Sequence, residues 1–149
     1  MSEQLELRLL GMLLGAAALA AVDQWVNLRV ASPLWAYHHR SGGWFAASAL
    51  LFVCMAALAM LPSLGVATGA ALFAGGLLGN MVSASGDHLW VPNPLLVGRG
   101  YGIAFNVADV CIMAGNLTLI VACSALAVRN RNQIESWRAS ARARLRRRS

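Results

Sequence analysis

The chain contains no lysine and has few charged residues of either sign. Its 149 residues include 12 basic side chains, all of them Arg, and 6 acidic ones, so only 12% of the residues are charged while 58% are hydrophobic. Soluble globular domains are typically about 45–50% apolar and about 25% charged. This scarcity of charge excludes an ordinary soluble domain, and the mean hydropathy of +0.60 is typical of a membrane protein.

The basic residues are also too unevenly distributed for a nucleic-acid-binding protein, which needs Lys and Arg spread over a folded face. Eight of the 12 Arg lie between positions 129 and 148. We therefore expect no nucleic-acid partner and interpret residues 129–149 as a basic cytoplasmic tail that binds the anionic lipid surface. The arginines expected to bind lipid are Arg142, Arg144, Arg146, Arg147 and Arg148.

Cysteine and histidine are too few and too scattered to predict a metal site. The three Cys lie inside apolar runs, where they are expected to pack as small hydrophobic side chains, and the three His lie in polar loops. Neither set has further partners at the spacing of metal ligands. We expect no metal ion and no other cofactor.

Four apolar segments are long enough to cross a bilayer, whose hydrocarbon core of about 30 Å requires about 20 residues of helix. The sequence therefore predicts an all-α integral membrane protein in which residues 1–128 form a bundle of four transmembrane helices. Glycines at four-residue spacing, such as Gly11 and Gly15 or Gly75 and Gly79, are expected to pack these helices closely. The predicted spans are residues 9–28, 44–61, 66–85 and 105–128.

Four spans place both termini on the same side of the membrane. Because cytoplasmic segments are enriched in Arg, the basic tail predicts that both termini are cytoplasmic and that the loops at residues 29–43 and 86–102 lie outside. A cleaved signal peptide is not expected, because Glu3 and Glu6 precede a single Arg8 in the leader.

Polar side chains inside the predicted spans gather near the outer surface. With a helix rise of about 1.5 Å per residue, Asp23, Asn80 and Asp109 come from three different spans to a similar depth. Asn27 and Asn106 lie at the same level. An ionisable side chain within a span costs about 2.5–3.5 kcal/mol on insertion scales. We therefore expect a single polar pocket there, and the lack of an ionisable group at the midplane argues against a proton-coupled carrier.

Structural and catalytic interpretations of these residues are both open at this point. Asn106 and Asp109 have the N-cap and N3 spacing of a helix start, and Asp23 could form an ion pair with Arg29 or Arg99. Alternatively, two neighbouring carboxyls that share one proton form the dyad of an aspartic protease. Such a dyad at the membrane surface would cleave a substrate where its own helix leaves the bilayer.

Two segments resemble conserved boxes of lipoprotein signal peptidase (signal peptidase II). Residues 75–80, Gly-Gly-Leu-Leu-Gly-Asn, are similar to the start of its G-N-x-x-D-R box, and residues 105–112, Phe-Asn-Val-Ala-Asp-Val-Cys-Ile, are similar to F-N-x-A-D-x-x-I. Asp23-Gln24 resembles the start of the D-Q-x-x-K box. The resemblance implies an aspartic endopeptidase that cleaves signal peptides of diacylglyceryl-modified prolipoproteins at the outer face of the bacterial cytoplasmic membrane.

Carried over by position, the resemblance makes Asp109 one catalytic aspartate and gives Asn80, Asn106 and Asp23 site-shaping roles. The second catalytic aspartate is missing, because Ser83 stands in its place and a hydroxyl cannot share the proton of a dyad as a carboxyl does. Ala84 and Asn27 replace the Arg and Lys of the boxes, and the N-x-G-A-A-F box is not found.

Asp87, four residues beyond Ser83, is the alternative partner for Asp109, although its place after Gly86 also suits a solvated turn. Two functions follow. An active signal peptidase II would use Asp109 with Asp87 on lipoprotein precursors. A degenerate relative would instead bind a lipidated membrane peptide, or a partner subunit in a membrane complex, without hydrolysis.

Overall fold

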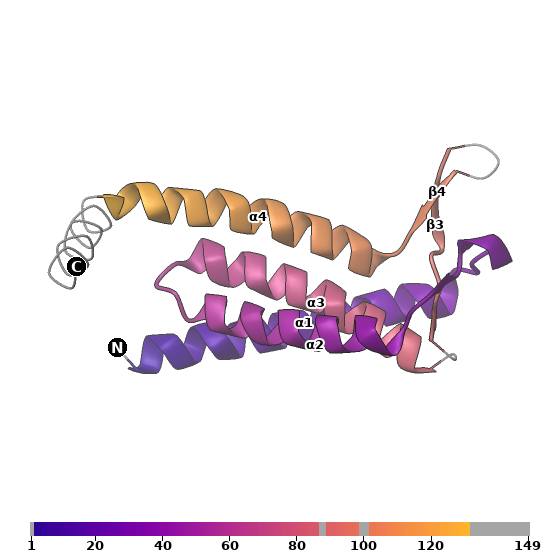
Figure 1. The fold of residues 1–149 in the computed structure, drawn as a ribbon, viewed down its shortest axis with the longest axis horizontal. Coiled ribbons are helices and arrows are strands. Elements are labelled where there is room, and N and C mark those ends of the chain that lie inside the picture. The colour runs from indigo at the N-terminus through magenta and orange to yellow at the C-terminus, as the bar shows by residue number, and fades with distance from the viewer. Residues whose placement is uncertain (1, 87–88, 99–101, 132–149) are drawn as a thin grey trace, which may run out of the picture.

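The computed structural model describes residues 2–86, 89–98 and 102–131. Four long helices run side by side, each long and apolar enough to span a membrane, which confirms the predicted four-helix membrane protein (Figure 1). The start of α1, the turn between α2 and α3 and the end of α4 lie at one end, called here the tail end, and the opposite end is the loop end. The helices are α1 (Ser2–Arg29), α2 (Gly42–Ala59), α3 (Leu64–Gly86) and α4 (Val107–Arg129).

Side-chain caps set where the helices begin. Ser41 Oγ accepts a hydrogen bond of 3.2 Å from Trp44 N, which starts α2 two residues before the predicted span. Asn106 Oδ1 accepts a bond of 2.8 Å from Asp109 N, so α4 starts two residues later than predicted. The three residues before Asn106, Ile103–Phe105, form a strand instead.

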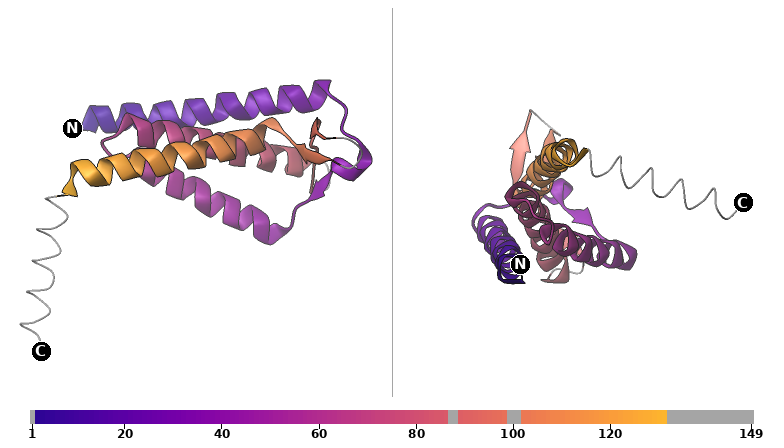
Figure 2. Two further views of the ribbon diagram at one scale, coloured as in Figure 1. Left: turned by 90° about the horizontal axis from the view of Figure 1, so that it is seen from above. Right: turned by 90° about the vertical axis from the view of Figure 1, so that its left-hand side faces the viewer.

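Helix α3 is the central helix, and it contacts each of the other three (Figure 2). Of its apolar segment 61% is buried, against 17%, 17% and 11% for α1, α2 and α4. Glycine allows this contact: a Cβ on Gly76 would lie 2.3 Å from Ala108 O, and one on Gly115 would lie 2.5 Å from Phe73 N. The two helix backbones of α3 and α4 therefore touch, as expected where small residues meet in a membrane.

One of the predicted glycine contacts is absent. Gly75 packs closely, since its Cβ would lie 2.8 Å from Leu19 Cβ, and Gly15 is in ordinary contact with Ala71. A Cβ on Gly11, however, would meet nothing within 4 Å. The prediction that Gly11 packs helices is therefore wrong, because α1 and α3 diverge towards the tail end and leave space there.

The loops at the loop end fold into two small antiparallel sheets that the sequence did not predict. In the first, His38 pairs with Val91, and in the second, Leu95 pairs with Phe105. Asn93 is fully buried, and its Nδ2 lies 3.1 Å from His38 Nδ1. Together with the short 3-10 helix η1 (Leu34–Ala36), these strands cover the loop end. The strands are β1 (His38–His39), β2 (Trp90–Val91), β3 (Leu95–Val97) and β4 (Ile103–Phe105).

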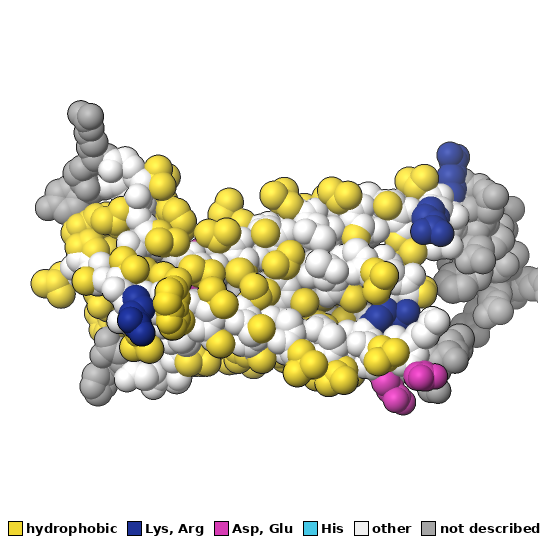
Figure 3. Space-filling model, turned by 180° about the vertical axis from the view of Figure 1, so that it is seen from behind, with side chains coloured by type: hydrophobic (Ala, Val, Ile, Leu, Met, Phe, Trp, Pro, Cys, Tyr) yellow, Lys and Arg dark blue, Asp and Glu magenta, His cyan; other side chains and the backbone are white. Residues whose placement is uncertain are grey.

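The outer surface of the bundle matches a lipid environment. On the face in Figure 3, charged side chains lie near the two ends, and hydrophobic side chains cover the length between them. At the loop end the guanidinium of Arg29 lies 5.8 Å from the ring of Trp25, and that of Arg40 lies 4.9 Å from the ring of Trp44. Aromatic and basic side chains of this kind mark the membrane–water boundary.

Candidate functional site

Seven polar side chains from three helices meet at the loop end of the bundle, where α1 and α3 end and α4 begins. We call this group the polar cluster. Its members are Asp23, Gln24, Asn27, Asn80, Ser83, Asn106 and Asp109. The structure thus brings together the residues of three spans that the helix rise had placed at one depth.

Asp23 ties α1 to the start of α4. Its Oδ1 accepts a hydrogen bond of 2.8 Å from Ala108 N, and its Oδ2 accepts from Asn27 Nδ2 at 3.0 Å and from Gln24 Nε2 at 3.2 Å. The side chain is only 1% exposed. All three partners are N–H donors, which suits a carboxylate that acts purely as an acceptor. Asp23 therefore has a structural role that uses both of its oxygens.

Ser83 is also held by α1. Its Oγ accepts hydrogen bonds of 2.9 Å from Gln24 Nε2 and 3.2 Å from Asn27 Nδ2. Gln24 Nε2 also lies 3.0 Å from Gly79 O, where a Cβ on Gly79 would come within 3.1 Å of Asp23 Oδ2. Glycine at position 79 thus lets α1 approach α3, and two amide donors converge on position 83.

Asp109 lies in the first turn of α4 and is half-buried, unlike Asn80 and Asn106, which are buried. Its Oδ1 accepts from Asn80 Nδ2 at 3.1 Å, and its Oδ2 accepts from Asn106 N at 3.4 Å. The last bond and the cap on Asp109 N form a capping box, so the structural interpretation of this spacing is confirmed. Asp109 is nevertheless the more exposed of the two carboxyls in the cluster, since Asp23 is buried.

Asn106 connects the helix start to the rest of the cluster. Its Nδ2 donates to Asn80 Oδ1 at 2.8 Å and to Pro92 O at 3.3 Å. The side chain is fully buried. One amide therefore caps α4, orients Asn80 towards Asp109, and holds the segment after β2.

The ion pair considered for Asp23 is not formed with Arg29, whose guanidinium lies over Trp25 instead. Arg99 lies outside the described residues, as does Asp87, the alternative partner of Asp109. The arginines of the tail that were predicted to bind lipid also lie outside: Arg142, Arg144, Arg146, Arg147 and Arg148.

Sequence reasoning included Gln24 in the resemblance to the D-Q-x-x-K box but did not predict its hydrogen bonds to Gly79 and Ser83. The contribution of Asn27 had a usable signal, because residues four apart share a helix face and Asn27 follows Asp23 by four. The backbone N–H of Ala108, which holds Asp23, has no signal in the sequence at all.

The polar cluster has one partly exposed carboxyl surrounded by amide groups, which suits binding a peptide group or a hydroxyl. A shared-proton dyad needs a second accessible carboxyl. Within the cluster the other carboxyl is Asp23, which is 1% exposed and accepts three hydrogen bonds, and position 83 holds a serine. Among the described residues, no three His, Cys, Asp or Glu side chains are grouped to hold a metal ion.

The fold is similar to that of a bacterial membrane enzyme. A solved structure described in those words superposes with a TM-score of 0.59 over 77% of this chain and 88% of its own chain, at 16% sequence identity. At this identity the similarity shows a shared fold. No family model matches the chain, and no curated protein matches it. The chain is therefore a multi-pass membrane protein, and its fold is shared with a membrane enzyme.

Proposed function

We propose that this chain is a signal peptidase II-like protein that binds a lipidated membrane peptide at the polar cluster and does not hydrolyse it by a two-aspartate mechanism. The observation that carries the proposal is that the cluster has no second carboxyl able to share a proton with Asp109. Asp23 is buried and accepts three N–H bonds, while Asp109 has a serine in place of its expected partner.

Binding is supported by what the cluster retains. Asp109 is half-buried at the loop end, with Asn80 and Asn106 fixed behind it by hydrogen bonds. The F-N-x-A-D-x-x-I pattern that resembles the family covers these residues of α4. An ordered amide and carboxyl at the edge of the membrane can hydrogen-bond the backbone of a peptide where it leaves the bilayer.

The second candidate is an active aspartic endopeptidase in which Asp87 replaces the missing carboxyl. What favours it is sequence position, because α3 ends at Gly86 at the loop end and Asp87 is the next residue. In that mechanism Asp87 and Asp109 share a proton, one acting as acid and the other as base towards a water molecule.

The environment proposed is the cytoplasmic membrane of a bacterium, with the tail end of the bundle in the cytoplasm. The concentration of Arg beyond α4 supports this orientation under the positive-inside rule. The proposed partners are a lipoprotein precursor or another lipidated membrane peptide, anionic lipid at the basic tail, and a partner subunit of a membrane complex.

The test is a cleavage assay with a lipidated prolipoprotein peptide and the purified full-length protein, alongside a binding measurement with the same peptide. We expect the wild type to bind the peptide without cleaving it. Ser83→Asp should create cleavage, because Gln24 Nε2 and Asn27 Nδ2 already point at this position and would stabilise a carboxylate there. Asp109→Asn in the Ser83→Asp background should remove that cleavage.

The rival mechanism gives a different pattern in the same assay. If the wild type cleaves the peptide, and Asp87→Asn and Asp109→Asn each abolish cleavage, the protein is an active enzyme and our proposal is wrong. Ser83→Ala is the matched control, because it removes the hydroxyl without adding a carboxyl. Failure of the wild type to bind the peptide at all would reject both candidates.

A further inference from the structure

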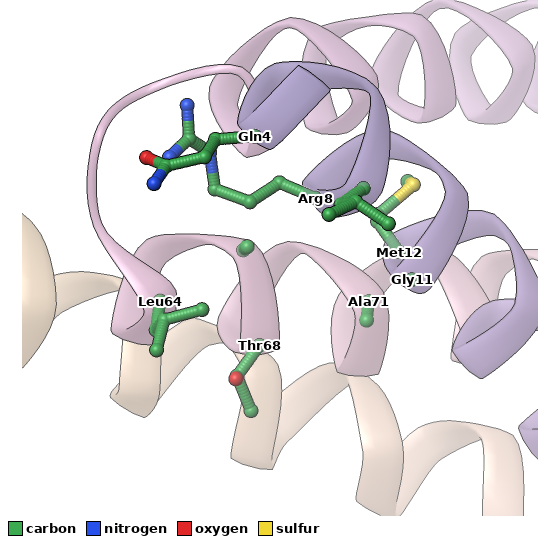
Figure 4. Close-up of a pocket in the computed structure, with 9 residues that line it drawn as sticks. Gln4, Arg8, Gly11, Met12, Leu64, Thr68 and Ala71 are labelled. Carbon is green, nitrogen blue, oxygen red and sulfur yellow. The ribbon is translucent and has the colours of Figure 1, made fainter. Parts of the chain in front are cut away.

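A groove opens between α1 and α3 at the tail end, far along the bundle from the polar cluster (Figure 4). Its volume is about 580 Å³, within the range of about 300–1,000 Å³ that is usual for small-molecule sites. The walls are mostly apolar, with Met12 and Ala71 deep along the helices and Leu64 at the start of α3. Gln4 and Arg8 extend over its mouth.

Arg8 brings a positive charge into this groove, and among the described residues no carboxylate forms an ion pair with it. Its Nη2 donates a long hydrogen bond of 3.5 Å to Met60 O, and its Nε is buried without a hydrogen-bond partner in the part of the chain described. Glu6 precedes it by two residues, and helix residues two apart point in different directions. A buried guanidinium N–H without an acceptor is costly, and a bound anion would supply the acceptor.

Gly11 borders the open space beside Arg8. This glycine lines the groove, and a Cβ built on it would meet nothing within 4 Å. The apolar space thus continues from the guanidinium along the helices towards the middle of the bundle. An anion with an attached hydrocarbon chain matches this shape and polarity.

We propose that the groove binds an anionic phospholipid, with its phosphate on Arg8 and Gln4 and an acyl chain against Met12 and Ala71. The charge of Arg8 selects an anionic headgroup, and Arg8 lies near one end of the apolar span of α1, where lipid headgroups are expected. The described residues that line the groove lie between positions 4 and 71, and the proposal does not depend on the proposed function of the polar cluster.

The experiment titrates the purified full-length protein in neutral detergent with a fluorescent phosphatidylglycerol and reads binding by anisotropy. Phosphatidylcholine and inorganic phosphate are the comparison ligands. The measurement is made at about 1 M salt, where the Debye length is about 3 Å and attraction of lipid to an exposed tail is screened. A buried pair is screened much less, so the groove site remains measurable.

Two variants distinguish the contribution of the Arg8 charge to lipid binding from that of the apolar space. Arg8→Gln is expected to weaken phosphatidylglycerol binding about tenfold, the effect of losing one charged hydrogen bond. Gly11→Leu fills the open space beside Arg8 while keeping its charge, and we expect it to weaken binding by a similar factor. Arg29→Gln is the matched control, since this arginine lies at the loop end over Trp25, and it should leave binding unchanged.

Each other outcome overturns the proposal. Equal affinity for phosphatidylcholine would mean that the groove does not select an anionic lipid. Binding of inorganic phosphate as tight as that of phosphatidylglycerol would identify an anion site without an acyl chain. Unchanged binding in both Arg8→Gln and Gly11→Leu, with unaltered helix content by circular dichroism, would show that lipid binds elsewhere.

Discussion

Replacing Gly76 by alanine should separate α4 from α3 and disturb the polar cluster without touching any polar side chain. The new Cβ would lie 2.3 Å from Ala108 O and 2.9 Å from Ile112 N, both backbone atoms of α4. An ordinary contact begins at 3.4 Å, so α4 must retreat by about 1 Å. The bonds from Ala108 N to Asp23 and from Asn80 to Asp109, at 2.8 and 3.1 Å, would then lengthen beyond hydrogen-bonding range.

The expected loss of stability follows from three contributions. Overpacking costs about 1–3 kcal/mol. Two weakened hydrogen bonds inside a membrane protein add about 0.6 kcal/mol each. Alanine in place of glycine within a helix returns about 1 kcal/mol. The net destabilisation is therefore about 1–3 kcal/mol.

The matched control is Gly11→Ala, whose Cβ meets no atom within 4 Å. Since only the helix-propensity gain applies, this variant should be about 1 kcal/mol more stable than wild type. The free energy of unfolding is measured in mixed micelles by titration with a denaturing detergent. If Gly76→Ala proves as stable as Gly11→Ala, the close backbone contact between α3 and α4 is not what we describe.

Three further predictions concern the cluster and the tail. Asp23→Ala should lower the free energy of unfolding by about 2 kcal/mol, because it removes three hydrogen bonds and leaves the buried N–H of Ala108 without its acceptor, and an unchanged midpoint in the same micelle assay would refute the tether. Asn106→Ala should cost about 1–2 kcal/mol, and more than Ser41→Ala, since Asn106 is a buried cap with two additional bonds while Ser41 is exposed; equal losses would contradict this. Binding of the full chain to anionic vesicles should weaken as salt rises, because surface attraction fades over a Debye length of about 8 Å at physiological salt, and salt-independent binding would argue against the tail's role. The tail arginines to replace by Gln in that assay are Arg142, Arg144, Arg146, Arg147 and Arg148.

The fold was largely predictable because the bilayer imposes one length and one polarity on every span. Counting apolar residues found all four helices, and the helix rise placed Asp23, Asn80 and Asp109 at one depth. The ends of the helices were less predictable, since they depend on single caps such as Ser41 and Asn106. Whether the two or three residues at a helix end join the helix or pair as a strand depends on such a cap. A hydropathy profile does not distinguish these two outcomes.

What the sequence could not supply were contacts that depend on approach distance. The strands at the loop end have only two or three residues each, too few to show alternation of polar and apolar side chains. The open space at Gly11 and the tight contact at Gly75 arise in the same small-residue spacing. Their difference comes from the divergence of α1 from α3 along the bundle, a property of the assembled helices.

The several structural roles of Asn106 affect how chains with this fold should be recognised from sequence. This amide caps the start of α4, bonds to Asn80 on α3 and holds the segment after β2, and Asp109 completes the same cap. A chain with this fold needs both residues whether or not it hydrolyses a peptide, because without them the start of α4 would fray. Retention of this signature therefore reports an intact architecture, and the residue at position 83 is the better indicator of chemistry.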